Sequence, residues 1–266
     1  MKEIDNEELK KIQIDILKAV CQFCEDSKLR YFLCAGTMLG AIRHKGFIPW
    51  DDDIDIMMPR PDYEIFVRNF KANQDYYKVY SLSVTKGYNN PFVKVSDERT
   101  LLLEDINENR IGVNIDIFPI DGFPSSKLRG YFHHLIIKIF KYCYCRKILT
   151  IRYKENILKK IIITILDMFL FVIPKSIFSK LIQKKAKKIP YETSKLLGIV
   201  VWGYGKREIC RKEVFKDYIS VEFENNQFRA MIGYDEYLHN VYGDYMKFPP
   251  IEERESHHNR IGTFWK

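Results

Sequence analysis

The sequence has no long apolar run, no internal repeat and no low-complexity segment. Its longest apolar stretch, IIITILDMFLFVI, spans 13 residues and includes Asp167, whereas a helix that crosses a bilayer needs ~20 apolar residues. The first residues, MKEIDNEELKKIQIDILKAV, lack the apolar core and the small-residue cleavage site of a signal peptide. We therefore expect a cytoplasmic protein without a transmembrane helix, whose six cysteines are reduced thiols.

Acidic residues are scarce in one part of the chain. Residues 127–188 contain 16 Lys or Arg but only Glu155 and Asp167, although the whole chain has a formal net charge of +8. The rest of the chain is therefore mildly acidic. Such asymmetry favours an anionic partner: a membrane, a nucleic acid or a polyanionic polymer.

Within this basic stretch, residues 157–188 read as amphipathic cationic helix. Such a segment suits the surface of an anionic membrane, so we expect the protein to lie peripherally on the inner face of the cell membrane. The alternative is a helix packed on the rest of the protein with a solvated basic face. Nucleic acid is not expected, because no known nucleic-acid-binding module is present.

Hydrophobic residues make up 46% of the chain and aromatic residues 14%, which is enough for a substantial core. Apolar spacing predicts helices over residues 5–29, 37–46, 60–73, 127–188 and 234–245, and strands over residues 31–36, 53–59, 76–82, 92–97, 100–106, 112–124, 195–205 and 218–232. The last strand pair is predicted to turn at Asn225 and Asn226. These elements predict a mixed α/β (α+β) fold that ends in a polar, histidine-containing tail.

Four aspartates crowd into FIPWDDDIDIMM, beside residues that favour burial. They are Asp51, Asp52, Asp53 and Asp55. Burying one unpaired carboxylate costs several kcal/mol, and clustering raises that cost. A hard divalent cation such as Mg²⁺ removes both penalties and leaves positions open for phosphate oxygens.

Alternation along a strand sets Asp53 and Asp55 on one face, where both can hold one ion. Asp116 stands in a second strand, NIDIF, with the same alternation, and is a natural third ligand. A solvated acidic turn is the alternative reading of the aspartates. The two strand patterns favour the metal reading without excluding the other.

Upstream, CAGTMLGAIRHKG places Gly36 and Thr37 at a junction between a strand and a helix. A helix N-terminus offers free backbone N–H groups to a phosphate. Arg43 and His44, two turns further on, can reach the same anion. Phosphate, cation and carboxylates are the parts of a phosphoryl-transfer site. A plain turn at Gly36 and a surface charge at Arg43 are the alternatives.

Three blocks of sequence resemble the LicD family of the nucleotidyltransferase-fold superfamily, which is also similar to the fukutin-related proteins. The blocks are AGTMLGAIRHKGFIPWDDDIDIMMPRPDY, VNIDIFPIDG and YDEYLHNVYGDYMKFPPIEERESHH. The resemblance implies a polymerase-β-like palm with a mixed sheet, over residues 1–126 and 189–266, and a helical basic insertion at residues 127–188.

The resemblance also implies a reaction. It implies a Mg²⁺-dependent phosphotransferase, with Mn²⁺ as a possible substitute, that moves phosphocholine from CDP-choline to a hydroxyl of a cell-surface glycan and releases CMP. The glycan is a teichoic acid, a capsule or a lipopolysaccharide, either lipid-linked or polymeric. Transfer of ribitol or glycerol phosphate from another CDP-alcohol, or a nucleotidyl transfer that releases pyrophosphate, are the alternatives.

The family's acidic pair maps onto Asp53 and Asp55, and its third carboxylate onto Asp116. On this mapping Asp116 completes the metal site and takes the acceptor's proton, and Asp51 is a further candidate ligand. The family's Gly-Ser element corresponds to Gly36 and Thr37.

Other residues are expected to contact the donor. Lys94 can neutralise charge on the leaving group, although it reads equally well as an exposed strand lysine. Aromatic faces bind a quaternary ammonium such as choline, and the candidates are Trp50, Trp202, Tyr204 and Tyr242. For any one of them, core packing is the alternative, and it is the more common role of an aromatic residue. The family block also includes three residues that can close over the donor, unless they form a polar tail: Arg254, His257 and His258.

Overall fold

The structure, a computed structural model, describes the chain except residues 105–110, 149–163, 165–166, 168–169 and 255–259. Its helices are α1 (Asn6–Asp26), α2 (Ala35–His44), α3 (Arg60–Asn69), α4 (Lys127–Ile148), α6 (Lys175–Ala186) and α7 (Tyr234–Tyr242), with short 3₁₀ turns at Gly205–Glu208, Lys212–Phe215 and Ile251–Glu253. Its strands are β1 (Lys2–Glu3), β2 (Phe32–Leu33), β3 (Asp55–Pro59), β4 (Tyr77–Tyr80), β5 (Val93–Asp97), β6 (Thr100–Glu104), β7 (Asn114–Phe123), β8 (Leu196–Ile199), β9 (Cys210–Arg211), β10 (Tyr218–Phe223), β11 (Asn226–Met231) and β12 (Arg260–Trp265).

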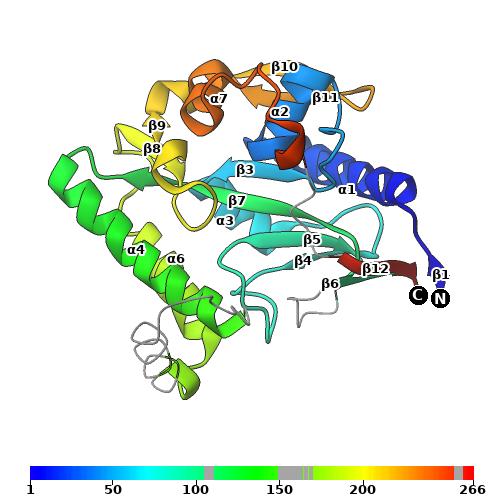
Figure 1. Cartoon of the computed structure of the whole chain (residues 1–266), viewed down its shortest axis with the longest axis horizontal. Helices are drawn as coiled ribbons and strands as arrows, with labels where there is room; N and C mark the ends of the chain where they lie inside the picture. Colours follow the sequence, from blue (N-terminus) through cyan, green and yellow to red (C-terminus); the bar gives the residue numbers. More distant parts are fainter. Residues whose placement is uncertain (105–110, 149–163, 165–166, 168–169, 255–259) are drawn as a thin grey trace.

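The main sheet has the order β2-β3-β7-β5-β4, and β8 extends it by pairing with β7 and β9. β7 crosses the middle of the molecule, with β3 on one side and β5 and β4 on the other (Figure 1). β3 and β7 run parallel, whereas β2, β5 and β8 are antiparallel to their partners. The predicted mixed sheet and α/β class are therefore confirmed.

The apolar residues of this sheet make its strands the centre of the core. Ile56, Met57 and Met58 of β3 are fully buried, because protein packs against both faces of the strand. α1 and α3 contact β7, whereas α2 contacts β3 and β10. In Figure 1, α2, α7, β10 and β11 lie together at the top of the view, above the main sheet.

α1 begins where the sequence supplies a cap. The Asp5 side chain accepts a hydrogen bond of 2.8 Å from the backbone N–H of Glu8, which satisfies one of the free N–H groups of the first turn. Leu9, Ile16 and Val20, at helical spacing, face the core and are almost fully buried. The helix predicted over residues 5–29 is confirmed, although it ends at Asp26.

Two turn predictions were wrong in position. The left-handed residue that ends α2 is Lys45, with φ 61°, instead of Gly46. The turn between β10 and β11 is formed by Glu224 and Asn225, because Phe223 pairs with Asn226. Both turn residues have positive φ, of 50° and 59°.

The prediction of a polar tail was wrong for the last residues. β12 pairs with β1 on one side and β6 on the other, so both ends of the chain meet in a small three-stranded sheet (Figure 1). Thr263 is buried in this sheet, whereas Ile261 is exposed, so the strand carries no simple alternation of apolar and polar residues.

The basic stretch folds as helices where the structure describes it. α6 buries Phe178, Ser179, Ile182 and Ala186, and it packs against α4. The apolar face of this helix therefore belongs to the protein interior, as the packed-helix alternative holds, whereas residues 157–163 lie outside the described residues. Within the described parts of the chain, no helix combines the length and apolar character that a membrane crossing requires.

Candidate active site

Three predicted residues stand side by side on three adjacent strands. In the parallel pairing of β3 with β7, Asp55 lies directly opposite Asp116. In the antiparallel pairing of β7 with β5, Asp116 lies directly opposite Lys94. The Nζ of Lys94 is 2.5 Å from Asp116 Oδ1 and 2.9 Å from Asn114 Oδ1. The predicted convergence of Asp55 and Asp116 is confirmed at the level of the strands, and Lys94 is no exposed strand lysine.

Asp55 is surrounded by like charge. Burial raises the pKa of Asp55 well above its ordinary value, and the carboxylates of Asp53, Asp116 and Asp51 raise it further, against a smaller opposite effect of Lys94. Asp53 stands just before β3 and is half-buried. Carboxylates that repel one another in this way are the donor set that a hard divalent cation stabilises, so their chemistry fits such an ion. Among the described residues, however, no three acidic, histidine or cysteine side chains are already gathered closely enough to enclose one.

The start of α2 contacts the acidic residues directly. Thr37 is buried, and its Oγ1 accepts a hydrogen bond of 2.8 Å from the backbone N–H of Asp55, which fixes the beginning of β3. A Cβ at Gly36 would lie 2.5 Å from Asp51 Oδ2, so this position accepts no side chain while Asp51 stays in place. Gly36 lies in the first turn of α2 instead of at the end of the preceding strand.

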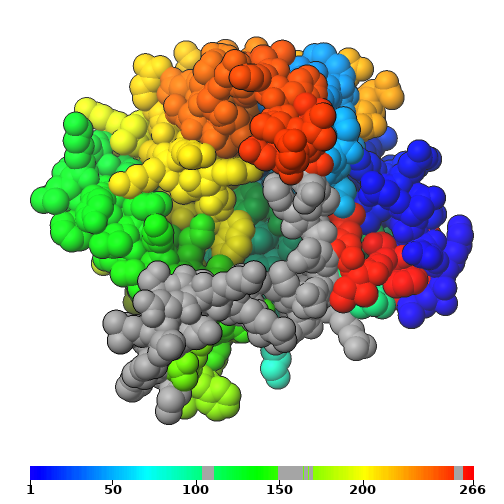
Figure 2. Space-filling model, viewed as in Figure 1, coloured from blue at the N-terminus to red at the C-terminus, as the bar shows by residue number. Residues whose placement is uncertain are grey.

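A pocket of about 510 Å³ opens beside this helix. Gly36, Arg43 and Asp51 line it together with aromatic side chains and further acidic ones: Trp50, Tyr204, Tyr242, Tyr245, Phe248, Asp244 and Glu253. Figure 2 shows a separate recess near the centre of this face, below the yellow segment, where teal and green atoms from the middle of the chain are visible. The pocket has the size of a small-molecule site.

Arg43 and His44 hold the wall of this pocket. Arg43 donates from Nη1 to the carbonyl of Tyr245 at 2.9 Å and from Nε to His44 Nε2 at 2.9 Å, and its guanidinium lies 4.8 Å from the centre of the Phe248 ring. Burial, with Arg43 close by, lowers the pKa of His44, which agrees with a neutral ring that accepts this hydrogen bond. Both side chains thus tie α2 to the loop after α7.

Arg254 covers the opposite part of the same wall. Its guanidinium lies 5.4 Å from the ring centres of both Trp50 and Phe248, and its Nε donates to the carbonyl of Pro249. The Tyr204 and Tyr242 rings meet edge to face at 5.5 Å. Three of the four aromatic candidates for a choline site therefore share one pocket.

Trp202, the fourth candidate, packs against other aromatic residues, as the core-packing alternative predicts. Its ring packs against Phe92 and Tyr144, at 5.6 and 6.0 Å between ring centres, and does not line the pocket. His257 and His258 lie outside the described residues.

Glu208 is a site residue that the sequence did not reveal. Its Oε2 accepts from the backbone N–H of Tyr204 at 2.7 Å, and its Oε1 accepts from the hydroxyl of Tyr237 at 3.1 Å. That hydroxyl accepts in turn from the N–H of Ala35, the first residue of α2, whose φ is 46°. Burial raises the pKa of Glu208 to about 7. Glu208 thus joins the start of α2 to Tyr204 in the pocket wall.

The sequence is similar to one protein family and to several individual proteins. Residues 28–146 match the family model described as "LicD/FKTN/FKRP, nucleotidyltransferase domain". The lipopolysaccharide cholinephosphotransferase LicD of Haemophilus influenzae is 36% identical over 265 residues, which cover 97% of each chain. An uncharacterised protein of Rickettsia prowazekii is 33% identical over 95 residues, 32% of this chain and 35% of that protein.

The matched family region includes α2, β3 and β7, which supply the central row of residues and the start of the pocket. The Haemophilus relative extends the likeness to almost the whole of both chains, and so to the loop after α7 that closes the pocket. The chain therefore belongs to the LicD family and is a transferase.

Proposed function

We propose that this protein transfers phosphocholine from CDP-choline to a hydroxyl group of a cell-surface glycan, of the lipopolysaccharide or teichoic acid kind, and releases CMP. The similar protein from Haemophilus influenzae bears the name of a lipopolysaccharide cholinephosphotransferase. A polymerase-β-like palm is the fold that we propose for the main sheet. The observation that carries the proposal is the row of Asp55, Asp116 and Lys94 beside an aromatic pocket.

The proposed site holds Mg²⁺ on Asp53 and Asp55, with Asp116 and Asp51 as further candidate ligands. When bound, the ion supplies positive charge that neutralises the diphosphate of the donor. The repulsion that raises the pKa of Asp55 supports this assignment, because a cation relieves it. Mn²⁺ has the same preference for oxygen ligands and is a workable substitute.

In the proposed reaction, the acceptor oxygen attacks the phosphorus that bears choline. The bond between this phosphorus and the bridging oxygen breaks, and the bridging oxygen leaves with CMP. The proton of the acceptor hydroxyl passes to a carboxylate of the row. Lys94, already bound to Asp116, offers positive charge to the leaving phosphate. Backbone N–H groups at Gly36 and Thr37 position the diphosphate.

The aromatic pocket supports choline as the transferred alcohol. A quaternary ammonium has no hydrogen-bond donors, and aromatic faces attract it. Trp50, Tyr204 and Tyr242 supply such faces, and Asp51 and Asp244 add negative charge to the same wall. These aromatic faces therefore support CDP-choline as the donor.

A glycan carried on lipid requires work at a membrane, so we propose peripheral attachment to the inner face of the cell membrane. Exposed apolar side chains on α4 support this: Leu128, Tyr131, Phe132 and Ile139. Basic residues of the same helix lie among them, including Lys138 and Arg129. A cationic surface with exposed aromatic residues suits an anionic lipid interface.

The test is to incubate the full chain and Mg²⁺ with CDP-choline, CDP-ribitol, CDP-glycerol or CTP, with and without a glycan acceptor. We expect acceptor-dependent release of CMP that is fastest with CDP-choline. Release of pyrophosphate from CTP, without CMP from any CDP-alcohol, would replace the proposal by nucleotidyl transfer. A preference for CDP-ribitol or CDP-glycerol would keep the chemistry and change the donor.

The aromatic pocket has its own test. Removing the ring in a Trp50→Ala variant should raise the KM for CDP-choline roughly three- to thirtyfold, as expected from cation–π energies, and change the KM for CDP-glycerol less. Trp202→Phe, outside the pocket, is the matched control. Equal losses with both donors would indicate that the pocket holds the cytidine, which the two donors share.

A further inference from the structure

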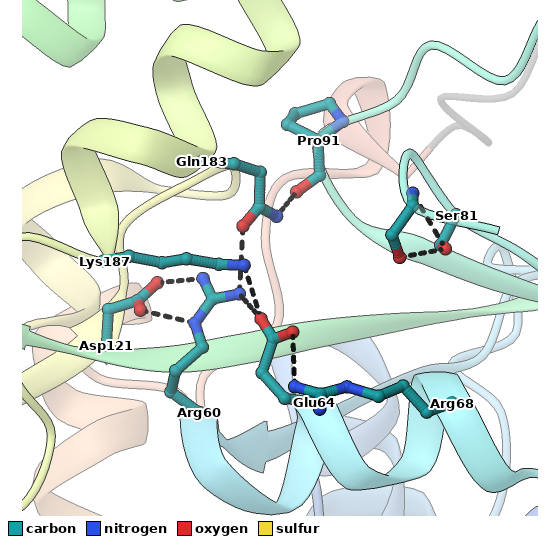
Figure 3. A network of polar contacts seen from close by, with 9 residues as sticks. Arg60, Glu64, Arg68, Ser81, Pro91, Asp121, Gln183 and Lys187 are labelled. Atoms are coloured by element: carbon teal, nitrogen blue, oxygen red, sulfur yellow. Dashed lines mark hydrogen bonds and ion pairs between the residues drawn. The ribbon is translucent and has the colours of Figure 1, made fainter.

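A second pocket, of about 440 Å³, lies between α3, α6 and the segment that joins β4 to β5. It shares no lining residue with the aromatic pocket described above. Figure 3 shows the polar network around it, in which side chains from α3, α6 and β7 meet. The pocket has the size of a ligand site, yet the proposed transfer reaction makes no use of it.

Its rim is strongly basic. Lys180, Lys184, Lys187 and Lys188 all line the pocket and are all exposed. Their spacing sets them on one face of α6 and its C-terminal end, where like charges four residues apart destabilise a helix. Of the four, only Lys187 has a carboxylate partner in the part of the chain that the structure describes, at 2.6 Å from Glu64. The rim is therefore short of negative charge.

The pocket does not depend on these lysines for its shape. Arg60, which is buried, binds Asp121 of β7 through two hydrogen bonds, of 2.7 and 2.6 Å. Its Nη1 donates to Gln183 Oε1 at 2.9 Å, and Gln183 Nε2 donates to the carbonyl of Pro91 at 2.5 Å (Figure 3). These hydrogen bonds connect α3, α6 and the β4–β5 segment, and so they fix the spacing between the walls of the pocket. Lys187 joins this framework through Glu64, whereas Lys180, Lys184 and Lys188 make none of its contacts.

The walls offer two kinds of surface. Ser81 and Ser83 both line the pocket. The buried Ser81 hydroxyl is bonded within its own loop, to Ser83 Oγ and to the backbone N–H groups of Ser83 and Val84. The exposed Ser83 is therefore the hydroxyl that suits phosphate oxygens. Val67, Leu82 and Phe92 add an apolar wall. A cationic rim with hydroxyl donors and an apolar wall matches a phosphate ester that carries an apolar or sugar part.

We propose that this pocket binds a phosphate group, either from an anionic lipid headgroup or as free phosphate. Exposed lysines at its rim meet the phosphate oxygens, and the Ser83 hydroxyl adds a further hydrogen bond. The site is separate from the transfer centre, and its occupation requires no turnover. In the lipid case, it would orient the protein on the membrane surface where the glycan acceptor is carried.

The test compares binding of the full chain to three probes: inorganic phosphate, vesicles of phosphatidylcholine, and vesicles that also contain phosphatidylglycerol. The test variant is Lys180→Ala with Lys184→Ala. The control is Lys185→Ala with Lys216→Ala, which removes the same charge from residues outside the pocket. Calorimetry measures phosphate binding, and co-sedimentation measures vesicle binding.

We expect the test variant to lose roughly thirtyfold in affinity for phosphate or for anionic vesicles, because each lysine adds about 1 kcal/mol near an anionic surface. The control should change less than about threefold for the same probe. Binding of free phosphate would identify phosphate itself as sufficient, and binding of anionic vesicles alone would identify the lipid headgroup.

Equal losses in test and control variants, or no binding of either anionic probe, would overturn the proposal. A Ser83→Ala variant, which keeps every charge and removes the exposed hydroxyl of the pocket, should also weaken binding of the anionic probe. Thermal melting of each variant checks that the chain remains folded. CMP release by the unaltered chain decides the transfer reaction separately, so either proposal can fail alone.

Discussion

Asp55 begins β3 in an environment that charge makes unfavourable. Its carboxylate is influenced by Asp53, Asp116 and Asp51, whereas Lys94 makes its close contact with Asp116. A side chain kept in this environment costs stability in the absence of a cation. Replacing Asp55 should therefore improve the stability of the fold without the ion and remove the activity.

An Asp55→Asn variant tests this expected opposition between stability and activity. We expect the turnover of CDP-choline to fall roughly a hundredfold to a thousandfold, because a charge that positions the diphosphate is lost. Without divalent ion, we expect the free energy of unfolding to rise, because the repulsion disappears. Turnover assays and urea unfolding measure the two effects.

Asp15→Asn, an exposed change on α1, is the control and should alter neither quantity. If Asp55→Asn lowered stability and activity together, Asp55 would be a structural residue and the assignment would fail.

The sequence predicted some of these residues and not others. Alternation in DIDIMM and NIDIF was enough to predict that Asp55 and Asp116 stand on buried strands. Lys94 remained ambiguous, because its contact with Asp116 depends on the pairing of β5 with β7, which strand patterns do not specify. Glu208 had no signal at all, since its burial arises from Tyr237 on a helix 29 residues further along the chain.

At the scale of elements, α2, α7 and the 203–208 segment act as one unit through Glu208. The hydrogen bonds of Glu208 fix Tyr204 on one side and, through Tyr237, the first turn of α2 on the other. Gly203 and Gly205 both have a φ of 70°, so this segment adopts a backbone that other residues rarely accept. A change at Glu208 should therefore disturb both Tyr204 and the first turn of α2, which belong to the proposed donor site.

The pKa of Glu208 makes the unit sensitive to pH. Burial raises this pKa from 4.5 to about 7. Between these values the folded chain keeps a proton that the unfolded chain has released. The free energy of unfolding should therefore fall as pH rises from about 4.5 to 7, by up to roughly 3 kcal/mol.

A Glu208→Gln variant should lose the part of this pH dependence that Glu208 contributes, because its side chain does not titrate, whereas the raised pKa of Asp55 still acts in the same direction. Its amide also cannot accept both hydrogen bonds, so we expect a higher KM for CDP-choline at pH 7. Urea unfolding across this pH range provides the measurement. Glu213→Gln, an exposed change, should keep the slope. An unchanged slope in Glu208→Gln would show that another group titrates.

Elements differed in how far their sequence determined them. α1 and β3 were predictable, because a cap and an apolar pattern agree at both. The turn at Glu224 and Asn225 was not, because an Asn-Asn pair follows one residue later and only the register of β10 with β11 decides between them. Phe47 N–H donates to Glu224 Oε1 at 3.0 Å and helps to hold Glu224 in its left-handed conformation.

For the whole molecule, the two ends of the chain are joined to the candidate site. β12 pairs with β1 and β6, and its first residue, Arg260, lies 2.8 Å from Asp52 Oδ2. Arg260 also donates to the backbone carbonyl of Asp52. Arg260 and Asp52 are 208 positions apart in the sequence. The sequence did not predict their contact, because the last residues were interpreted as a polar tail.

Breaking that contact should weaken both fold and function. An Arg260→Ala variant leaves a half-buried carboxylate at Asp52 with one partner fewer, so the free energy of unfolding should fall by about 1–3 kcal/mol. Turnover should fall as well, because Asp52 stands beside Asp51 and Asp53, which are proposed metal ligands. Lys266→Ala is the control from the same end of the chain, since its 3.8 Å contact with Glu98 is looser and more exposed. Equal effects of the two changes would contradict a link from β12 to the site.

The most direct measurement is the binding of Mn²⁺, followed by electron paramagnetic resonance in the presence of CDP-choline. We predict that the unaltered chain and Asp15→Asn bind the ion alike, whereas Asp55→Asn binds it at least about tenfold more weakly. Equal binding by all three proteins, or no binding by the unaltered chain, would contradict a metal-dependent transfer centre at β3 and β7.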